Sequence, residues 1–172
     1  MKIKLIKTTL EMKNEYYDYI KEWEESKEEI VPYSARLLGD TYEEWLKKTI
    51  KFEEKETCPL NFVSASTYFL VREDKKIIGA INIRHSLNDY LLKFGGNIGY
   101  GIRPSERKQG YASQMLSLGL LIIKQMGIKK VLITCDVKNI GSAKTIIKNG
   151  GILENEVQEK NRVIQRYWIT ID

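Results

Sequence analysis

Residues 102–112 read IRPSERKQGYA, and this is the most informative stretch of the sequence. A strand-like segment ends at a proline, a charged loop follows, and a long apolar helix opens at Gly110. The first N–H groups of a helix have no partner within it, and the macrodipole adds positive charge there. Gly110 and Ala112 let the backbone approach a ligand closely, and Arg107 and Lys108 add charge. The stretch therefore suits a phosphate or pyrophosphate group. Because it is neither a GxGxxG nor a P-loop sequence, it also fits an ordinary strand–loop–helix connection.

Hydrophobic periodicity on both sides of this stretch predicts a mixture of strands and helices. The predicted strands cover residues near 3–5, 66–72, 77–84, 97–103, 130–135 and both sides of a turn at 159–161, and the predicted helices cover 10–25, 41–50, 110–126 and 142–148. Residues 86–96 are ambiguous. The order β-α-α-β-β-β-α-β-α-β-β predicts one mixed α/β sheet, with at least one right-handed strand–helix–strand crossover near its centre.

Length and composition place the chain among single-domain globular proteins. Of its 172 residues, 42% are hydrophobic and 30% are charged, which excludes a disordered or collagen-like protein. The two cysteines, Cys58 and Cys135, form no disulfide framework, and the lone His85 excludes a multi-histidine metal site. No signal-peptide core opens the sequence, and the longest apolar run, residues 116–123, is too short to span a bilayer. We expect a cytoplasmic protein without a metal or a membrane partner.

The net charge of +5 is unevenly distributed along the chain. Residues 10–56 contain eight Lys/Arg and fourteen Asp/Glu, whereas residues 97–172 contain twelve and six. Such segregation fits two solvated faces, and it also fits an anionic ligand on the C-terminal half and a cationic one on the N-terminal half. A nucleic-acid partner is not expected, because Lys and Arg never run beyond two in a row and no basic stripe is interleaved with aromatic residues.

The pattern Arg107-x-x-Gly110-x-Ala112 resembles the acetyl-coenzyme A signature of the GNAT superfamily of N-acetyltransferases. Residues 97–102 (NIGYGI) resemble that family's splayed fourth strand, and residues 139–142 (NIGS), before a short helix that ends in Gly-Gly, resemble its second coenzyme-binding element. The resemblance runs from about Phe69 to the C-terminus. It implies one α/β domain with a mixed, mostly antiparallel sheet, a splayed central strand pair and flanking helices.

The resemblance also implies that two parts of the single domain, residues 1–172, have different roles. Helices within about residues 1–65 would face the acceptor, and about residues 66–172 would form the coenzyme-binding core. The amides of the loop 107–112 would hold the pyrophosphate, and the pantetheine arm would lie against the backbone near Ile102. The residues implied to bind acetyl-coenzyme A are Ile102, Arg107, Lys108, Gln109, Gly110, Tyr111, Ala112, Asn139 and Ser142. Asn139 could instead be only a helix N-cap, and Ser142 only a solvent contact in the first helical turn.

Direct transfer of the acetyl group needs a neutral amine, a polarised thioester carbonyl and a proton for the departing thiolate. A backbone N–H near Gly101 or Ile102 would polarise the carbonyl. Many family members use a tyrosine and a carboxylate for the proton transfers, but those positions hold Ile146 and Asn97 here. No covalent enzyme intermediate is required if the coenzyme and the amine are held side by side.

The remaining candidates for a general base are His85, just after a predicted strand, and Asp136, at the end of another. Tyr100 and Tyr111 are candidate proton donors. Cys135 as a nucleophile is the weakest candidate, because a buried cysteine behaves as a small hydrophobic residue by default. Catalysis by positioning and ordered water alone is a further alternative.

The sequence leaves the acceptor open between a small-molecule amine and a protein amine. Aromatic residues in the N-terminal part favour either an aromatic-lined groove or simply core packing (Tyr16, Tyr17, Tyr19, Trp23 and Tyr33). Two further function classes compete with an N-acetyltransferase: a catalytically silent coenzyme-binding sensor or scaffold and, less favoured, a nucleic-acid-binding module. A homodimer is compatible with the sequence but is not indicated by it.

Overall fold

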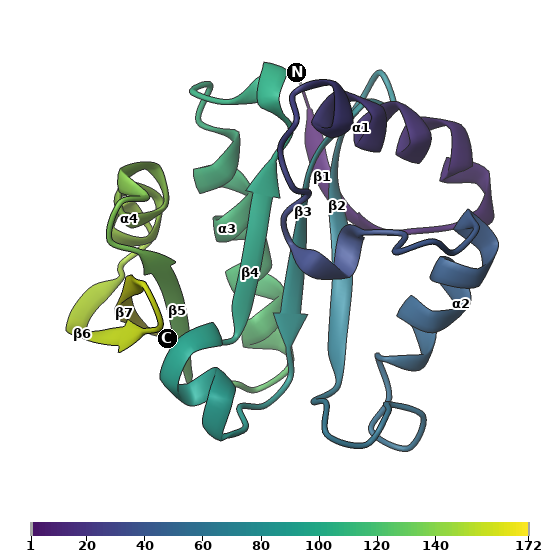
Figure 1. Cartoon of the computed structure of the whole chain (residues 1–172). Helices are drawn as coiled ribbons and strands as arrows, with labels where there is room; N and C mark the ends of the chain where they lie inside the picture. The colour runs from purple at the N-terminus through teal and green to yellow at the C-terminus, as the bar shows by residue number, and fades with distance from the viewer. Residues whose placement is uncertain (1, 172) are drawn as a thin grey trace.

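The computed structural model describes residues 2–171, and its elements follow the predicted order (Figure 1). The strands are β1 (Ile3–Lys7), β2 (Ala65–Arg72), β3 (Ile77–Arg84), β4 (Ile98–Ile102), β5 (Lys130–Asp136), β6 (Ile152–Glu159) and β7 (Arg162–Thr170). The α-helices are α1 (Lys13–Glu25), α2 (Tyr42–Lys51), α3 (Tyr111–Gln125) and α4 (Ile140–Lys148). Short helical turns are η1 (Leu10–Met12), η2 (Tyr33–Ala35), η3 (Leu91–Gly95) and η4 (Pro104–Glu106). The ambiguous segment 86–96 thus contains the turn η3.

The seven strands form one sheet in the order β1-β2-β3-β4-β5-β7-β6. Every neighbouring pair is antiparallel except β4 and β5, which are parallel. These two strands share a single pairing, Ile98 with Ile133, and diverge beyond it (Figure 1). The predicted fold class, a mostly antiparallel sheet with a splayed central pair, is confirmed.

Local sequence signals explain the element boundaries. The Thr41 Oγ1 atom accepts a hydrogen bond from the Glu44 backbone N–H at 3.3 Å, and the Glu44 carboxylate accepts one from the Thr41 N–H at 2.8 Å. This reciprocal capping box starts α2, as the sequence predicts. The polar turn 73–76 joins β2 and β3 in a hairpin, also as predicted.

Two hydrophobic cores pack against opposite faces of the sheet. Helix α3 buries Met115, Leu116 and Ile123 on one face, and α1 and α2 bury an aromatic cluster on the other. Tyr16 and Tyr19 are fully buried in that cluster. The alternative of an aromatic-lined groove is therefore wrong for these two residues, whose rings pack around Phe69 of β2.

The buried side chain of Asn97 holds the point where β4 and β5 diverge. The side-chain Oδ1 accepts a hydrogen bond from the Leu132 N–H at 2.9 Å, and the backbone N–H of Asn97 donates to the Leu132 carbonyl at 2.7 Å. Its carbonyl accepts from the Arg84 N–H on the other side. Asn97 thus joins β3 to β5 at the start of β4, which fixes the apex of the splay.

Candidate functional site

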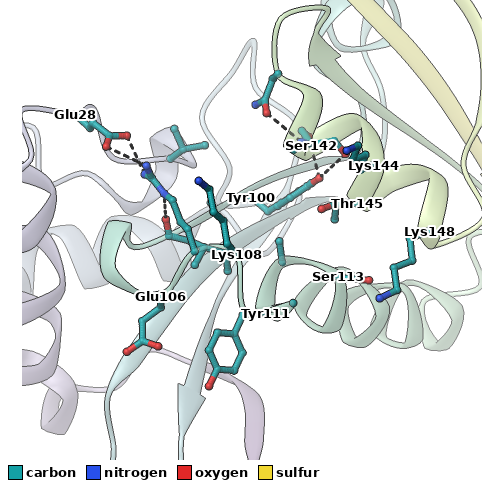
Figure 2. Close-up of a pocket in the computed structure, with 18 of the residues that line it drawn as sticks. Glu28, Tyr100, Glu106, Lys108, Tyr111, Ser113, Ser142, Lys144, Thr145 and Lys148 are labelled. Carbon is teal, nitrogen blue, oxygen red and sulfur yellow. Dashed lines mark hydrogen bonds and ion pairs between the residues drawn. The ribbon is translucent and has the colours of Figure 1, made fainter.

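A cleft of about 760 Å³ opens where β4 and β5 diverge. Its walls come from α1 and the segment after it, the end of β4, the start of α3 and the inner side of α4 (Figure 2). The lining residues are Trp23, Glu28, Glu29, Val31, Tyr100, Gly101, Ile102, Glu106, Arg107, Lys108, Gly110, Tyr111, Ala112, Ser113, Asn139, Gly141, Ser142, Lys144, Thr145 and Lys148.

The start of α3 presents backbone donors to this cleft. Gly110 precedes the helix with φ +83°, a left-handed conformation that glycine adopts without strain. Within residues 2–171, no acceptor receives a hydrogen bond from the N–H groups of Gly110, Tyr111, Ala112 or Ser113. These donors at the positive end of the helix dipole form a site for an anionic group.

Charged side chains divide the cleft into a basic and an acidic side. Lys144 and Lys148 lie on the wall formed by α4, and Lys108 lies in the loop before α3 (Figure 2). Glu28 and Glu29 lie on the opposite wall, after α1. An anionic ligand is therefore favoured along α3 and α4.

Arg107 connects the two sides rather than projecting freely into the cleft. Its Nε donates to the Ile102 carbonyl at 3.1 Å, and its guanidinium pairs with the Glu28 carboxylate at 2.9 Å. The guanidinium also lies 5.1 Å from the ring centroid of Trp23. Arg107 thus ties the loop before α3 to the segment after α1.

The exposed edge of β4 offers further backbone groups. The Arg84 N–H donates to the Asn97 carbonyl, and the Arg103 N–H donates to the Ile78 carbonyl, so alternate residues of β4 are bonded to β3. By this alternation the N–H of Gly101 points toward β3, whereas the N–H groups of Tyr100 and Ile102 point toward the gap. Tyr100 and Ile102 are thus positioned to bond an extended ligand.

A pair of hydroxyl groups spans the gap between β4 and α4. The Tyr100 hydroxyl lies 2.9 Å from the Ser142 Oγ (Figure 2). Burial raises the pKa of Tyr100 to about 12, so its hydroxyl stays protonated at neutral pH. Tyr100, one of the candidate proton donors, lines the cleft, whereas Ile146 is fully buried in the core.

The structure brings together most of the predicted coenzyme-binding residues. The cleft is lined by Ile102, Arg107, Lys108, Gly110, Tyr111, Ala112, Asn139 and Ser142. Gln109 is not among the lining residues, and its side-chain amide donates to the Ser105 carbonyl at 3.4 Å. Asn139 also caps α4, because its Oδ1 accepts from the Ser142 N–H at 3.0 Å.

Neither predicted candidate for the general base lines the cleft. The His85 Nε2 lies 2.9 Å from the Ser66 Oγ, and burial lowers the pKa of the imidazole. The Asp136 Oδ1 accepts a hydrogen bond from the Lys138 N–H at 2.8 Å, so this carboxylate closes the turn after β5. The Asn97 side chain also bonds to the backbone: it donates to the Arg84 carbonyl and accepts from the Leu132 N–H.

Several lining residues were not predicted from the sequence. Lys144 and Lys148 are four residues apart on α4, and their helical spacing after Asn139 is a signal that could have revealed them. Glu28 and Val31 reach the cleft through tertiary packing, and no local signal marks them. Trp23, one of the aromatic residues for which the sequence left a groove open, is mostly buried in the core and also borders the cleft. The sequence therefore reveals the walls made by α3 and α4 better than the wall made by α1.

Two further observations concern the chain as a whole. Within residues 2–171, no group of three or more His, Cys, Asp or Glu side chains is arranged to hold a metal ion. In the same described part, no helix is both long and apolar enough to cross a membrane.

Comparison with known proteins places this fold in a family. A family model described as "Acetyltransferase (GNAT) domain" matches residues 9–152. No curated protein sequence matches the chain.

Solved structures of similar fold cover nearly the whole chain at low sequence identity. The microcin C7 self-immunity acetyltransferase MccE, in complex with acetyl-CoA and AMP, has a TM-score of 0.71 at 20% identity, covering 98% of this chain and 92% of that one. The ribosomal L7/L12 acetyltransferase RimL, in complex with coenzyme A, has a TM-score of 0.73 at 17% identity, covering 99% and 94%. A chimera of the spermidine N-acetyltransferase SpeG from Vibrio cholerae and hSSAT has a TM-score of 0.67 at 14% identity, covering 99% and 96%.

These findings confirm the resemblance that the motifs around Gly110 and Asn139 indicated. The family match covers the loop before α3, β4 and α4, which together form the cleft. It also confirms the expected class of enzyme, an acetyltransferase that uses acetyl-coenzyme A as cosubstrate. The chain belongs to the GNAT acetyltransferase family.

Proposed function

We propose that this protein transfers the acetyl group of acetyl-coenzyme A to a primary amine by direct attack in a ternary complex. The observation that carries the proposal is the row of unpaired N–H groups from Gly110 to Ser113 on the wall of the cleft between β4 and β5. A pyrophosphate bound there places the rest of the coenzyme along the open edge of β4.

The coenzyme lies along the basic side of the cleft in this proposal. Residues 107–112 surround the pyrophosphate, and the N–H groups of Tyr100 and Ile102 face the pantetheine arm and the acetyl group. Ser142 and Asn139 border the arm from α4. The narrowing of the gap toward the Ile98–Ile133 pairing supports a thioester position near Tyr100.

The chemistry then requires one bond to form and one to break. The amine nitrogen attacks the thioester carbon, the carbon–sulfur bond breaks, and the thiolate takes a proton from the Tyr100–Ser142 hydroxyl pair. The Tyr100 N–H stabilises the negative charge that develops on the carbonyl oxygen. The amine nitrogen gives up one proton to solvent, and the hydroxyl pair regains a proton from solvent.

Solvent is the proposed proton acceptor because the carboxylates of the cleft already have cationic partners. Glu28 pairs with Arg107, Glu29 with Arg36, and Glu106 with Arg72 and Lys76. Deprotonating an alkylamine of pKa about 10.4 at pH 7 costs about 4.6 kcal/mol. Positioning two reactants in one cleft lowers a barrier by about 7–11 kcal/mol, which exceeds this cost.

The experiment that tests the proposal measures thiol release from acetyl-coenzyme A with a panel of amines. The panel contains amino acids, a diamine, spermidine and a short peptide with a free N-terminus. We expect amine-dependent thiol release with at least one acceptor and an acetylated product of the matching mass. Coenzyme binding without turnover of any amine would contradict the transferase and support the silent sensor that Asn97 and Ile146 allow.

A further inference from the structure

Arg84 differs from every other arginine in the chain. The sequence contains seven arginines, and Arg36, Arg72, Arg103, Arg107, Arg162 and Arg166 each pair with a carboxylate. Within residues 2–171, Arg84 has no carboxylate within ion-pair distance. Burial lowers the pKa of its guanidinium, which is the electrostatic cost of leaving this charge without an anion.

One arm of the Arg84 guanidinium is used inside the fold and the other is not. Its Nη1 donates to the carbonyls of Gly95 and Gly96, at 3.0 and 2.9 Å, where the turn η3 ends. No protein acceptor within residues 2–171 engages Nη2 or Nε. A guanidinium presents its donors as a planar fork, so the unused arm matches a carboxylate or a phosphoryl group.

The unused arm lies beside the part of β4 where the acetyl group is expected. Its Nη2 lies 3.6 Å from the position that a Cβ atom on Gly99 would take, and Pro32 borders the same position at 3.5 Å. Gly99 directly precedes Tyr100, and one strand residue spans about 3.3 Å. The guanidinium is thus within two residue lengths of the proposed thioester position.

Arg84, the last residue of β3, lies beside Gly99 on the face of the sheet that the segment after α1 covers. Gly101, which lines the cleft, faces the same segment, since a Cβ atom there would meet the Val31 carbonyl oxygen. Gly99 faces the same segment at Pro32. The segment between α1 and α2 crosses this face of the sheet (Figure 1). Arg84 does not itself line the cleft, so a group of the acceptor would reach it past Gly99 and Pro32.

We propose that Arg84 binds an anionic group of the acceptor, so that the enzyme acetylates amines that also carry a carboxylate or a phosphoryl group. This inference rests on the proposed function. The anion satisfies the unused arm of the fork. An amino acid or an aminophosphonate supplies this anion, whereas spermidine carries no group for Arg84.

The test compares acceptors that differ only in the anionic group. One comparison pairs α-amino acids with their amides. A second comparison pairs 2-aminoethylphosphonate with ethanolamine, and spermidine is the cationic reference. For each acceptor, kcat/KM of Arg84→Gln is divided by that of the wild type, which cancels the intrinsic reactivity of each amine. We expect a loss of about 30-fold or more for the anionic members and less than about threefold for the neutral ones. The comparison that shows the larger loss indicates whether Arg84 binds a carboxylate or a phosphoryl group.

Two further variants separate anion binding from support of the turn η3. Arg84→Lys keeps the charge but lacks the fork, so it should recover only part of the selectivity. Arg166→Gln is the matched control, because Arg166 also donates to a carbonyl of η3, that of Leu92, at 2.9 Å. We expect this control to affect anionic and neutral acceptors equally.

Two outcomes would overturn the inference while leaving the proposed function intact. The first is turnover confined to neutral amines or spermidine. The second is an equal loss for anionic and neutral acceptors in Arg84→Gln, or the same selective loss in Arg166→Gln. Absence of thiol release with every amine would instead contradict the proposed function itself.

Discussion

The two walls of the cleft are built in different ways. The coenzyme wall, formed by the end of β4 and the starts of α3 and α4, presents mainly backbone groups, such as the N–H groups from Gly110 to Ser113. The acceptor wall, named after the proposed function, is formed by the end of α1 and the segment after it, and it presents side chains from separate parts of the chain. Arg84, at the end of β3, lies beside Gly99 but does not line the cleft. A wall made of backbone is encoded by a short local motif, whereas a wall made of side chains is assembled only by folding.

The largest effect on the coenzyme wall is expected at the side chain of Tyr100. Tyr100→Phe removes the hydroxyl that faces Ser142 while keeping the ring in the core. We expect kcat to fall about 100-fold with coenzyme affinity unchanged, as for loss of a general acid. Because burial raises the pKa of Tyr100 to about 12, its ionisation should not affect the rate of the wild type between about pH 6 and 9.

Tyr167→Phe is the matched control for this variant. Tyr167 is also buried, and its hydroxyl donates to the Gln165 Oε1 at 2.8 Å, away from the residues that line the cleft. Equal values of kcat for the two variants would show that backbone groups suffice on the coenzyme wall and that water protonates the thiolate.

The next largest effect is expected on coenzyme affinity. Gly110→Val forces a β-branched residue into a left-handed conformation at φ +83°, so the loop rearranges and the N–H groups of α3 lose their alignment. We expect the Kd of acetyl-coenzyme A, measured by calorimetric titration, to rise at least about tenfold. A change of that size corresponds to about 1.4 kcal/mol.

The opposite end of the same helix provides the control. Gly127 follows α3 with φ +76° and has open space around it. Gly127→Val therefore introduces a similar backbone strain without touching the cleft. If both variants weaken coenzyme binding equally, the effect of Gly110→Val is general destabilisation. The backbone N–H groups at the start of α3 would then not account for coenzyme binding.

The same distinction explains how much of the molecule the sequence predicts. The element order and the capping box at Thr41 follow from periodicity and local motifs. The splayed pair and the coenzyme wall were expected from the family resemblance of residues 97–102 and of the motifs around Gly110 and Asn139. Arg84 could not be assigned, because its relation to the cleft depends on which helix covers which face of the sheet.

Asn97 shows a second reason why prediction from sequence has limits. In the sequence it is a residue without charge where many family members have a carboxylate, which suggests a lost function. In the fold, its amide joins Leu132 to the end of β3, so it positions the splay instead. The sequence pattern identifies position 97 as the start of the splayed strand, but only the hydrogen bonds show what Asn97 does there.

The smallest effects are expected at the two candidates for the general base. His85→Ala and Asp136→Asn remove side chains that do not line the cleft, so kcat/KM should change less than about threefold in each. Its dependence on pH should follow the pKa of the amine, which two acceptors of different pKa would reveal. A drop beyond about 100-fold in either variant, with coenzyme affinity intact, would identify a base that acts from outside the cleft.

The most direct test is a crystal structure with coenzyme A bound. We expect pyrophosphate oxygens within about 3.2 Å of the N–H groups from Gly110 to Ser113. We also expect the thiol sulfur to lie within hydrogen-bonding reach of the Tyr100 hydroxyl. A pyrophosphate bound away from the start of α3, or a sulfur that does not enter the gap between β4 and β5, would contradict the proposed binding mode.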